Sequence, residues 1–80
     1  MKTFERVGYL RSVVWEDRVP PGTDVQQAAR DGIIEQATAI GVPFRWDHDQ
    51  YGARWDETGY TDVHGWKSTA FIVREVSDGE

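Results

Sequence analysis

The chain has 80 residues, enough for one small domain, and its core must be efficient because a chain of this length buries only about 60 to 65% of its unfolded surface. It contains no cysteine, which excludes a disulfide and a thiolate nucleophile and leaves histidine and carboxylate as the only zinc ligands. The net charge of -5 disfavours binding to duplex nucleic acid, which depends on clustered Lys and Arg, and favours basic partners.

The sequence also indicates a cellular compartment and a source for the protein. The chain contains no stretch of about 18 consecutive apolar residues, and residues 1–6 lack the apolar run of a signal peptide. We therefore expect a cytoplasmic protein without a membrane partner. Arginine outnumbers lysine, a usage typical of GC-rich genomes, and the small size suggests a bacterial or phage origin.

The first predicted element is a long strand over residues 4–17, which are rich in Val, Tyr, Trp and Phe and contain no proline. Alternation divides its apolar side chains between two faces. One face carries Val7, Tyr9, Val13 and Trp15, and the other carries Leu10 and Val14. A bulge at Gly8 would change the facing. Two partly apolar faces favour a strand inside the sheet or at an interface.

The clearest predicted element is a helix over residues 24–40. Thr23, the expected N-cap, and Gln26 have the spacing of a capping box, which pairs two backbone amides at the start of a helix. Gly41 and Pro43 follow the last helical residue and are typical of a helix end of the Schellman type.

The predicted helix has one apolar stripe at positions that recur every three or four residues. It consists of Val25, Ala28, Ala29, Ile33, Ala37 and Ile40. This stripe predicts that the helix packs one side on a sheet. Gly32 lies in the helix interior, where glycine costs up to about 1 kcal/mol relative to alanine, and it indicates a close approach of the helix to the sheet.

The rest of the chain is predicted to form sheet. Strands are expected over residues 43–49, 53–58 and 66–76, with a loop at residues 59–65 and a polar C-terminal tail at residues 77–80. The predicted order is β-α-β-β-β. We expect a single α+β domain over residues 1–76, in which one helix packs on a mainly antiparallel four-stranded sheet.

A short repeat, Arg45-Trp46-Asp47 and Arg54-Trp55-Asp56, raises the question of how its two copies meet. We favour a turn at residues 49–52, which forms a hairpin with Trp46 opposite Trp55 and with two pairs of opposite charge, and which buries both tryptophans in the core under the helix. A turn with a glycine bulge would shift this register by one residue. A single bent strand over residues 43–57, paired with residues 66–76, is the third arrangement.

Protein binding is the function that the sequence favours most. One helix cannot cover both sides of a four-stranded sheet, so apolar surface is left, and such surface usually marks an interface with another protein or with a second copy of the chain. The aromatic candidates for this interface are Trp15, Tyr51, Tyr60 and Trp66. We therefore expect a small acidic accessory or inhibitory module, with a homodimer as one form. No catalytic signature is present, and we expect no catalysis, no cofactor and no bound metal.

A single-stranded nucleic acid is the alternative ligand. Arginines beside tryptophans can stack unpaired bases on a sheet surface, as in some RNA-binding modules. This function requires Trp46 or Trp55 in solvent with Arg45 and Arg54 beside it. Neighbouring acidic residues such as Asp47 oppose a phosphate backbone.

A metal-dependent enzyme or a metal sensor is the third function considered. His48, His64 and Asp62 carry the side chains that metals prefer. Asp62 and His64 alternate, which places them on one side of an extended segment. The site also requires His48 to lie close to both. No HExxH motif and no serine elbow accompanies these residues.

Overall fold

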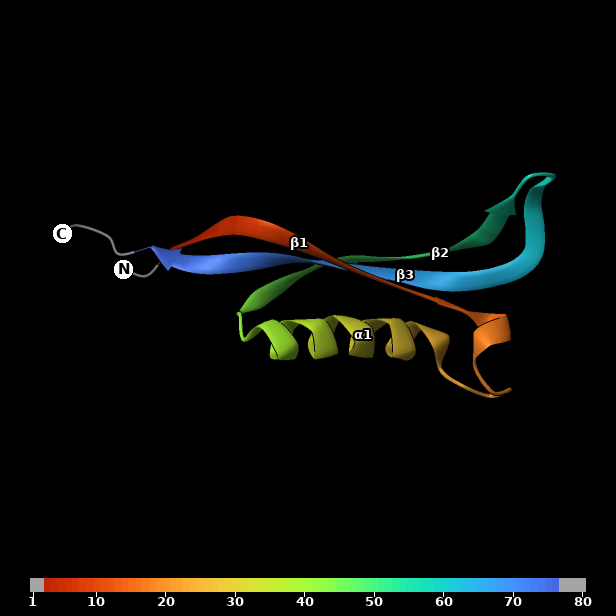
Figure 1. Cartoon of the computed structure of the whole chain (residues 1–80), viewed down its shortest axis with the longest axis horizontal. Helices are drawn as coiled ribbons and strands as arrows, with labels where there is room; N and C mark the ends of the chain where they lie inside the picture. The colour runs from red at the N-terminus through yellow and green to blue at the C-terminus, as the bar shows by residue number, and fades with distance from the viewer. Residues whose placement is uncertain (1–2, 77–80) are drawn as a thin grey trace.

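The computed structural model describes residues 3–76. The elements in chain order are β1 (Thr3–Trp15), the short 3-10 helix η1 (Glu16–Arg18), α1 (Val25–Ile40), β2 (Phe44–Asp56) and β3 (Gly59–Val76). The strands form one antiparallel sheet in the order β1-β3-β2, so the last strand lies between the first two (Figure 1). Because β1 and β2 are both antiparallel to β3, they run in the same direction, as expected for two strands joined by a crossover helix.

The prediction of a four-stranded sheet is wrong, because the described residues form three strands, although the α+β class agrees with the structure. The predicted turn at residues 49–52 lies within β2, and the predicted loop at residues 59–65 is the first part of β3. The chain reverses direction in the short segment between these two strands instead. The predicted tail at residues 77–80 lies outside the described residues.

The turn between β2 and β3 depends on Asp56, Thr58 and Gly59. The Asp56 carboxylate accepts hydrogen bonds from the Thr58 hydroxyl at 2.7 Å and from the Thr58 amide at 2.8 Å, and these bonds hold the pKa of Asp56 below its ordinary value. Gly59 has a φ of 118°, which L side chains rarely adopt. By contrast, Gly52 lies opposite Gly65 inside the ladder, so Gly52 belongs to the sheet and makes no turn.

The two copies of the Arg-Trp-Asp repeat lie on one strand, so the third arrangement is confirmed, although the partner segment reaches back to the start of β3. Trp46 lies opposite Ala70 and Trp55 lies opposite Tyr60, and both predicted hairpin registers are therefore wrong. A bulge between Trp46 and Asp49 shifts the alternation by one residue. As a result, both of these side chains lie on the face that α1 covers.

β1 has the two faces that its alternation predicts. Leu10 is buried in the core, whereas Tyr9 and Val13 are exposed on the opposite face. A bulge between Arg6 and Gly8 changes the facing near the start of the strand. The strand ends earlier than predicted because η1 follows it directly.

α1 begins one residue later than predicted, and its N-cap is Asp24 instead of Thr23. The Asp24 side chain accepts a hydrogen bond from the Gln27 amide at 3.1 Å, whereas the Thr23 hydroxyl donates to a carbonyl of the preceding turn. The predicted C-terminal end is confirmed. Gly41 has a φ of 79°, and the amide that follows it donates to a carbonyl in the last helical turn at 3.1 Å.

The core lies between α1 and the sheet. It consists of Leu10, Ile33, Ala37 and Ala70, with Phe44 and Ile72 packed against them. Ile40, which the apolar stripe includes, is exposed. A Cβ atom at Gly32 would collide with the side chain of Ser12 on β1, so the predicted close approach of the helix is confirmed.

A polar contact also joins α1 to β2 and β3. The Asp49 carboxylate accepts hydrogen bonds from Gln26 at 2.8 Å, from Arg30 at 2.7 Å and from Ser68 at 2.7 Å. Burial of Asp49, whose side chain is only 9% exposed, would raise its pKa, but these hydrogen bonds and the Arg30 charge outweigh burial and hold the pKa below its ordinary value. Asp49 thus connects the helix to two strands.

One face of the sheet is left uncovered. The molecule measures 55 × 25 × 18 Å, whereas a helix of 16 residues is about 24 Å long. No element within residues 3–76 covers the face opposite α1 (Figure 1). We call it the open face, and the strand registers place on it Phe4, Arg6, Tyr9, Arg11, Val13, Trp15, Arg45, Lys67, Thr69 and Phe71.

Candidate functional site

A hollow of about 330 Å³ lies at the end of the open face near the turn between β2 and β3. Three of the four aromatic residues predicted for an interface line it: Trp15, Tyr60 and Trp66. Val13 and Lys67 line it as well. Figure 1 shows that this end of the sheet curves away from α1, so the two strands rise on the side of the open face. We call this cavity the hairpin-end hollow.

Two glycines make room for the hairpin-end hollow. Trp15, Gly65 and Gly52 lie side by side across the three strands. The Trp15 ring lies over Gly65, where a Cβ atom would meet it. The Cζ atom of Arg54 lies 5.8 Å from the centre of the same ring, and Asp17 holds Arg54 through hydrogen bonds of 3.2 and 3.3 Å. Trp15 is therefore a well-defined wall of the hollow.

Tyr51, the fourth predicted aromatic, does not line the hollow but contacts one of its walls. The ring centres of Tyr51 and Trp66 are 5.2 Å apart, and the ring of His64 stacks on Tyr51 at 5.3 Å. The Tyr51 hydroxyl donates a hydrogen bond of 2.9 Å to Glu16, which raises the pKa of Tyr51 above its ordinary value. The structure thus brings the four predicted residues to one end of the sheet.

Two exposed rings stand at the same end. Tyr60 is 76% exposed and Trp55 is 67% exposed, and their ring centres are 5.1 Å apart at an angle of 82°. Exposed aromatic rings are frequent anchors of protein interfaces. Sequence reasoning missed Trp55 as an interface residue because it placed Trp55 in the core, opposite Trp46.

A second hollow, of about 390 Å³, lies toward the other end of the open face. Arg6, Arg45, Phe4, Phe71 and Val73 are among the residues that line it. We call it the arginine hollow. The bulge that Gly8 indicated near the start of β1 places Arg6 on the same face as Phe71. Sequence reasoning missed this hollow because the local pattern does not show which residues of distant strands lie side by side.

A hydrogen-bonded cluster lies between the two hollows. The Tyr9 hydroxyl donates to the Asp47 carboxylate at 3.3 Å, and the Thr69 hydroxyl donates to the same oxygen at 3.1 Å. His48 Nδ1 is 3.2 Å from that oxygen. The Tyr9 ring also packs edge-on against Phe71, with ring centres 5.2 Å apart. These contacts hold the side chains of Tyr9 and Asp47 in place in the middle of the open face.

The lysines and arginines of residues 3–76 fall into two groups. One group is paired with carboxylates: Arg18 and Arg54 with Asp17, Arg30 with Asp49, and Arg74 with Glu5. In the other group, no hydrogen bond or ion pair joins the charged group to any residue within 3–76; its members are Arg6, Arg11, Arg45 and Lys67. All four members of the second group lie on the open face.

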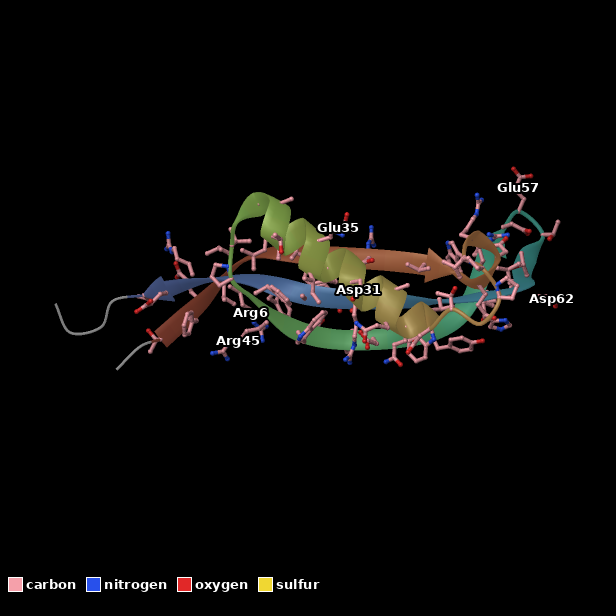
Figure 2. All side chains as sticks on the ribbon, turned by 90° about the horizontal axis from the view of Figure 1, so that it is seen from below. Arg6, Asp31, Glu35, Arg45, Glu57 and Asp62 are labelled. Atoms are coloured by element: carbon pink, nitrogen blue, oxygen red, sulfur yellow. The ribbon has the colours of Figure 1, made fainter. Side chains whose placement is uncertain are left out.

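The acidic side chains lie mostly elsewhere. Figure 2 shows Asp31 and Glu35 on α1 and Glu57 and Asp62 at the hairpin end, away from Arg6 and Arg45. On the open face itself the strand register places two carboxylates, those of Asp47 and Glu75. The net charge of -5 therefore does not describe this face, on which unpaired cations outnumber carboxylates.

The arrangement required for stacking nucleic acid on the tryptophans is not formed. Trp46 is 45% exposed, but the side chain beside it is Arg30 of α1, with its Cζ atom 5.5 Å from the ring centre. Arg45 lies on the other face of the sheet, where its Cζ atom is 5.3 Å from the ring centre of Phe4. Arg54 is paired with a carboxylate of η1.

The structure does not gather the residues of the metal hypothesis. His48 lies in the β2 bulge beside Asp47. His64 lies opposite Ala53, farther along the same pair of strands, and its Nδ1 atom contacts the backbone carbonyl of Asp62 at 3.1 Å. Within residues 3–76 there is no group of three or more side chains that could hold a metal ion.

Comparison with known proteins adds no relative to this picture. No protein-family model, no curated protein and no solved structure matches the chain. No helix within residues 3–76 has the length and apolar character needed to cross a membrane. The architecture alone therefore defines the structural class of the protein, which is an α+β fold with one helix on a three-stranded antiparallel sheet whose other face is open.

Proposed function

We propose that the protein is a small non-enzymatic protein-binding module, accessory or inhibitory in role, and that it binds its partner through the open face. The observation that carries this proposal is an uncovered sheet face with a hollow toward each end. Exposed side chains on that face, such as Tyr9 and Val13, are available for burial. The proposed setting is the cytoplasm of a bacterium or of a phage-infected cell, and the absence of cysteine suits a reducing compartment.

The open face is large enough for a stable interface. The face of the sheet spans the longest and the shortest dimensions of the molecule, 55 Å and 18 Å, because Figure 1 shows the helix and the sheet stacked along the remaining one; the two multiply to an outline of about 1,000 Å². A typical interface buries about 800 Å² on each partner. A partner that covers about four fifths of this outline would therefore form a contact of ordinary size.

Two aromatic side chains of the open face, those of Trp15 and Tyr9, are held by contacts within the described chain. The Trp15 ring is held between Gly65 and Arg54, and the Tyr9 hydroxyl is held by Asp47. An ordered surface loses less conformational entropy on association than a flexible one. This order supports a binding role for the face.

A different protein is favoured over a second copy as the partner. Two open faces packed against each other by a two-fold axis would bring like surfaces together. Such a contact would bring the unpaired cations of both copies into one interface, and like charges that come close oppose association. A homodimer is the competing outcome.

The first test is the solution mass, measured by light scattering coupled to size exclusion at several concentrations. We expect the monomer mass of 9.2 kDa. Twice that mass in the wild type, together with the monomer mass in the Val13→Asp variant, would instead identify a second copy of the chain on the open face.

The second test uses variants that change different faces. Val13→Asp and Tyr60→Ser alter the hairpin-end hollow, whereas Ile34→Ser alters the exposed side of α1 and is the matched control. Each immobilised protein is exposed to an extract of the source cells, and a protein retained by the wild type is identified, purified and titrated against the isotope-labelled chain. We expect amide shifts on the open face and an affinity at least about tenfold lower for Val13→Asp but unchanged for Ile34→Ser. Amide shifts confined to α1 would contradict the proposal.

A further inference from the structure

We propose that the arginine hollow is a carboxylate-binding site, and that the partner inserts there an acidic side chain from a segment in which acidic and apolar residues alternate. This inference rests on the proposed function, because it names the chemistry of the partner that the open face binds. The placement of two guanidinium groups, the lack of an anionic partner for them within residues 3–76 and the side chains around them support it.

Both guanidinium groups are held by aromatic rings. The Cζ atom of Arg6 lies 4.1 Å from the ring centre of Phe71, and the Cζ atom of Arg45 lies 5.3 Å from the ring centre of Phe4. Arg6 comes from β1 and Arg45 from β2, so they approach the hollow from opposite sides of β3. A guanidinium stacked on a ring keeps its N–H edge available, and this edge matches the two oxygens of a carboxylate.

The two guanidinium groups have no anionic partner within residues 3–76. This contrasts with Arg30, Arg54 and Arg74, each of which is paired with a carboxylate of the same chain. Asp47 also lines the hollow, but its carboxylate already accepts hydrogen bonds from Tyr9 and Thr69. The hollow therefore contains charged donors that are not neutralised from within the described chain.

The surroundings favour an acidic protein segment over single-stranded nucleic acid. Nucleic acid binds sheet surfaces by stacking bases on free aromatic rings, but here guanidinium groups lie over Phe4 and Phe71. Asp47, at the rim of the hollow, would repel the regularly spaced phosphates of a backbone.

The other side chains of the open face indicate which residues of the partner flank its inserted acidic side chain. Arg11 and Lys67 provide two further unpaired cations, and Tyr9 and Val13 provide exposed apolar surface between the two hollows. An extended segment with alternating acidic and apolar side chains would match this pattern, because charged and apolar groups would meet their complements.

The test is a titration of the isotope-labelled chain with a short synthetic peptide in which glutamate and valine alternate. Two ligands of the same length serve for comparison: the same peptide with glutamine in place of glutamate, and a thymidine oligonucleotide. We expect the acidic peptide to shift the Nε–H signals of Arg6 and Arg45, and the glutamine peptide to leave them unchanged. Added salt should weaken the binding, because the site is exposed to solvent.

Matched variants separate the site from general charge attraction. The double variant Arg6→Gln/Arg45→Gln removes both donors, and Arg74→Gln removes one exposed cation near the same end of the sheet but on the face of α1. We expect the affinity for the acidic peptide to fall at least about tenfold in the double variant and to stay within about twofold of the wild type in Arg74→Gln. All three side chains are exposed, so the variants should fold, and circular dichroism checks this.

Two results would overturn the inference: no shift of the arginine signals with the acidic peptide, or tighter binding of the oligonucleotide than of the acidic peptide. The failure of this inference is distinguishable from the failure of the proposed function. If the natural partner binds Arg6→Gln/Arg45→Gln as tightly as the wild type but loses affinity for Val13→Asp, only the carboxylate site is wrong. If Val13→Asp has no effect on that partner, the open face is not the binding surface.

Discussion

At the scale of single residues, Gly32 sets how closely α1 approaches β1. A Cβ atom at this position would collide with the Ser12 side chain. We therefore expect Gly32→Ala to lower the free energy of unfolding by about 1 to 3 kcal/mol, although alanine is about 1 kcal/mol better than glycine inside a helix. Urea denaturation measures this change. Gly52→Ala is the control, because an added Cβ there meets nothing within 4 Å, and a more stable Gly32→Ala protein would refute the explanation.

Trp46 also allows a prediction at this scale. Were it a core residue, its replacement by alanine would cost about 3 to 5 kcal/mol. It is 45% exposed, and its contacts are the ring of Phe44 at 5.0 Å and the guanidinium of Arg30 at 5.5 Å. We expect Trp46→Ala to lower the free energy of unfolding, measured by thermal or urea denaturation, by about 1 to 2 kcal/mol, which is less than the loss for a buried tryptophan. A loss above about 3 kcal/mol would show that the ring is part of the core.

At the scale of the elements, Asp49 links α1 to the sheet and makes stability depend on pH. The pKa of Asp49 in the folded protein lies below its ordinary value of 3.8, so the ionised form stabilises the fold fully above that pH. This stabilisation is lost as the pH falls through the lowered pKa, because the proton then binds the folded state as well. We expect Asp49→Asn to cost about 1 to 3 kcal/mol at neutral pH, the range for hydrogen bonds to a charged group.

Urea denaturation of the wild type and of Asp49→Asn from neutral pH to about pH 2.5 tests this assignment. The difference between the two free energies of unfolding should be constant above about pH 5 and should shrink below about pH 4. Asp31→Asn, which changes an exposed carboxylate of α1, is the matched control and should show a much smaller effect. A difference that does not change with pH would mean that the Asp49 charge plays no part in the contact.

The elements differ in how far the sequence predicts them. α1 and the two faces of β1 could be predicted, because the periodicity of their apolar side chains matches the burial that the fold imposes. The path of β2 and β3 could not. The residue types of Asp49 and Gly52 are typical of a turn. In the structure, however, the Asp49 carboxylate accepts hydrogen bonds from three side chains distant in the sequence, and Gly52 pairs with Gly65 inside the sheet. The turn forms at Gly59, where the backbone requires a positive φ.

At the scale of the whole molecule, the candidate site was predictable in part. The sequence pointed to Trp15, Tyr60 and Trp66 as interface residues, and they line one hollow. Whether they bind a protein stays a prediction. The arginine hollow could not be foreseen, because the net charge of the chain says nothing about which cations are paired, and the pairing depends on the register of strands far apart in the sequence.

The position of β3 has a consequence for how the protein is made. β1 and β2 do not pair with each other, and each finds its hydrogen-bonding partner only in the final strand. No ladder of the described sheet can therefore close during synthesis until residues of β3 have left the ribosome, and most of the contacts that then form join residues distant in sequence. We expect a chain that ends at Thr58 to lack the sheet signal in circular dichroism and to be degraded quickly in cells. A folded and persistent truncated chain would show that the helix and the first two strands can assemble without their common partner.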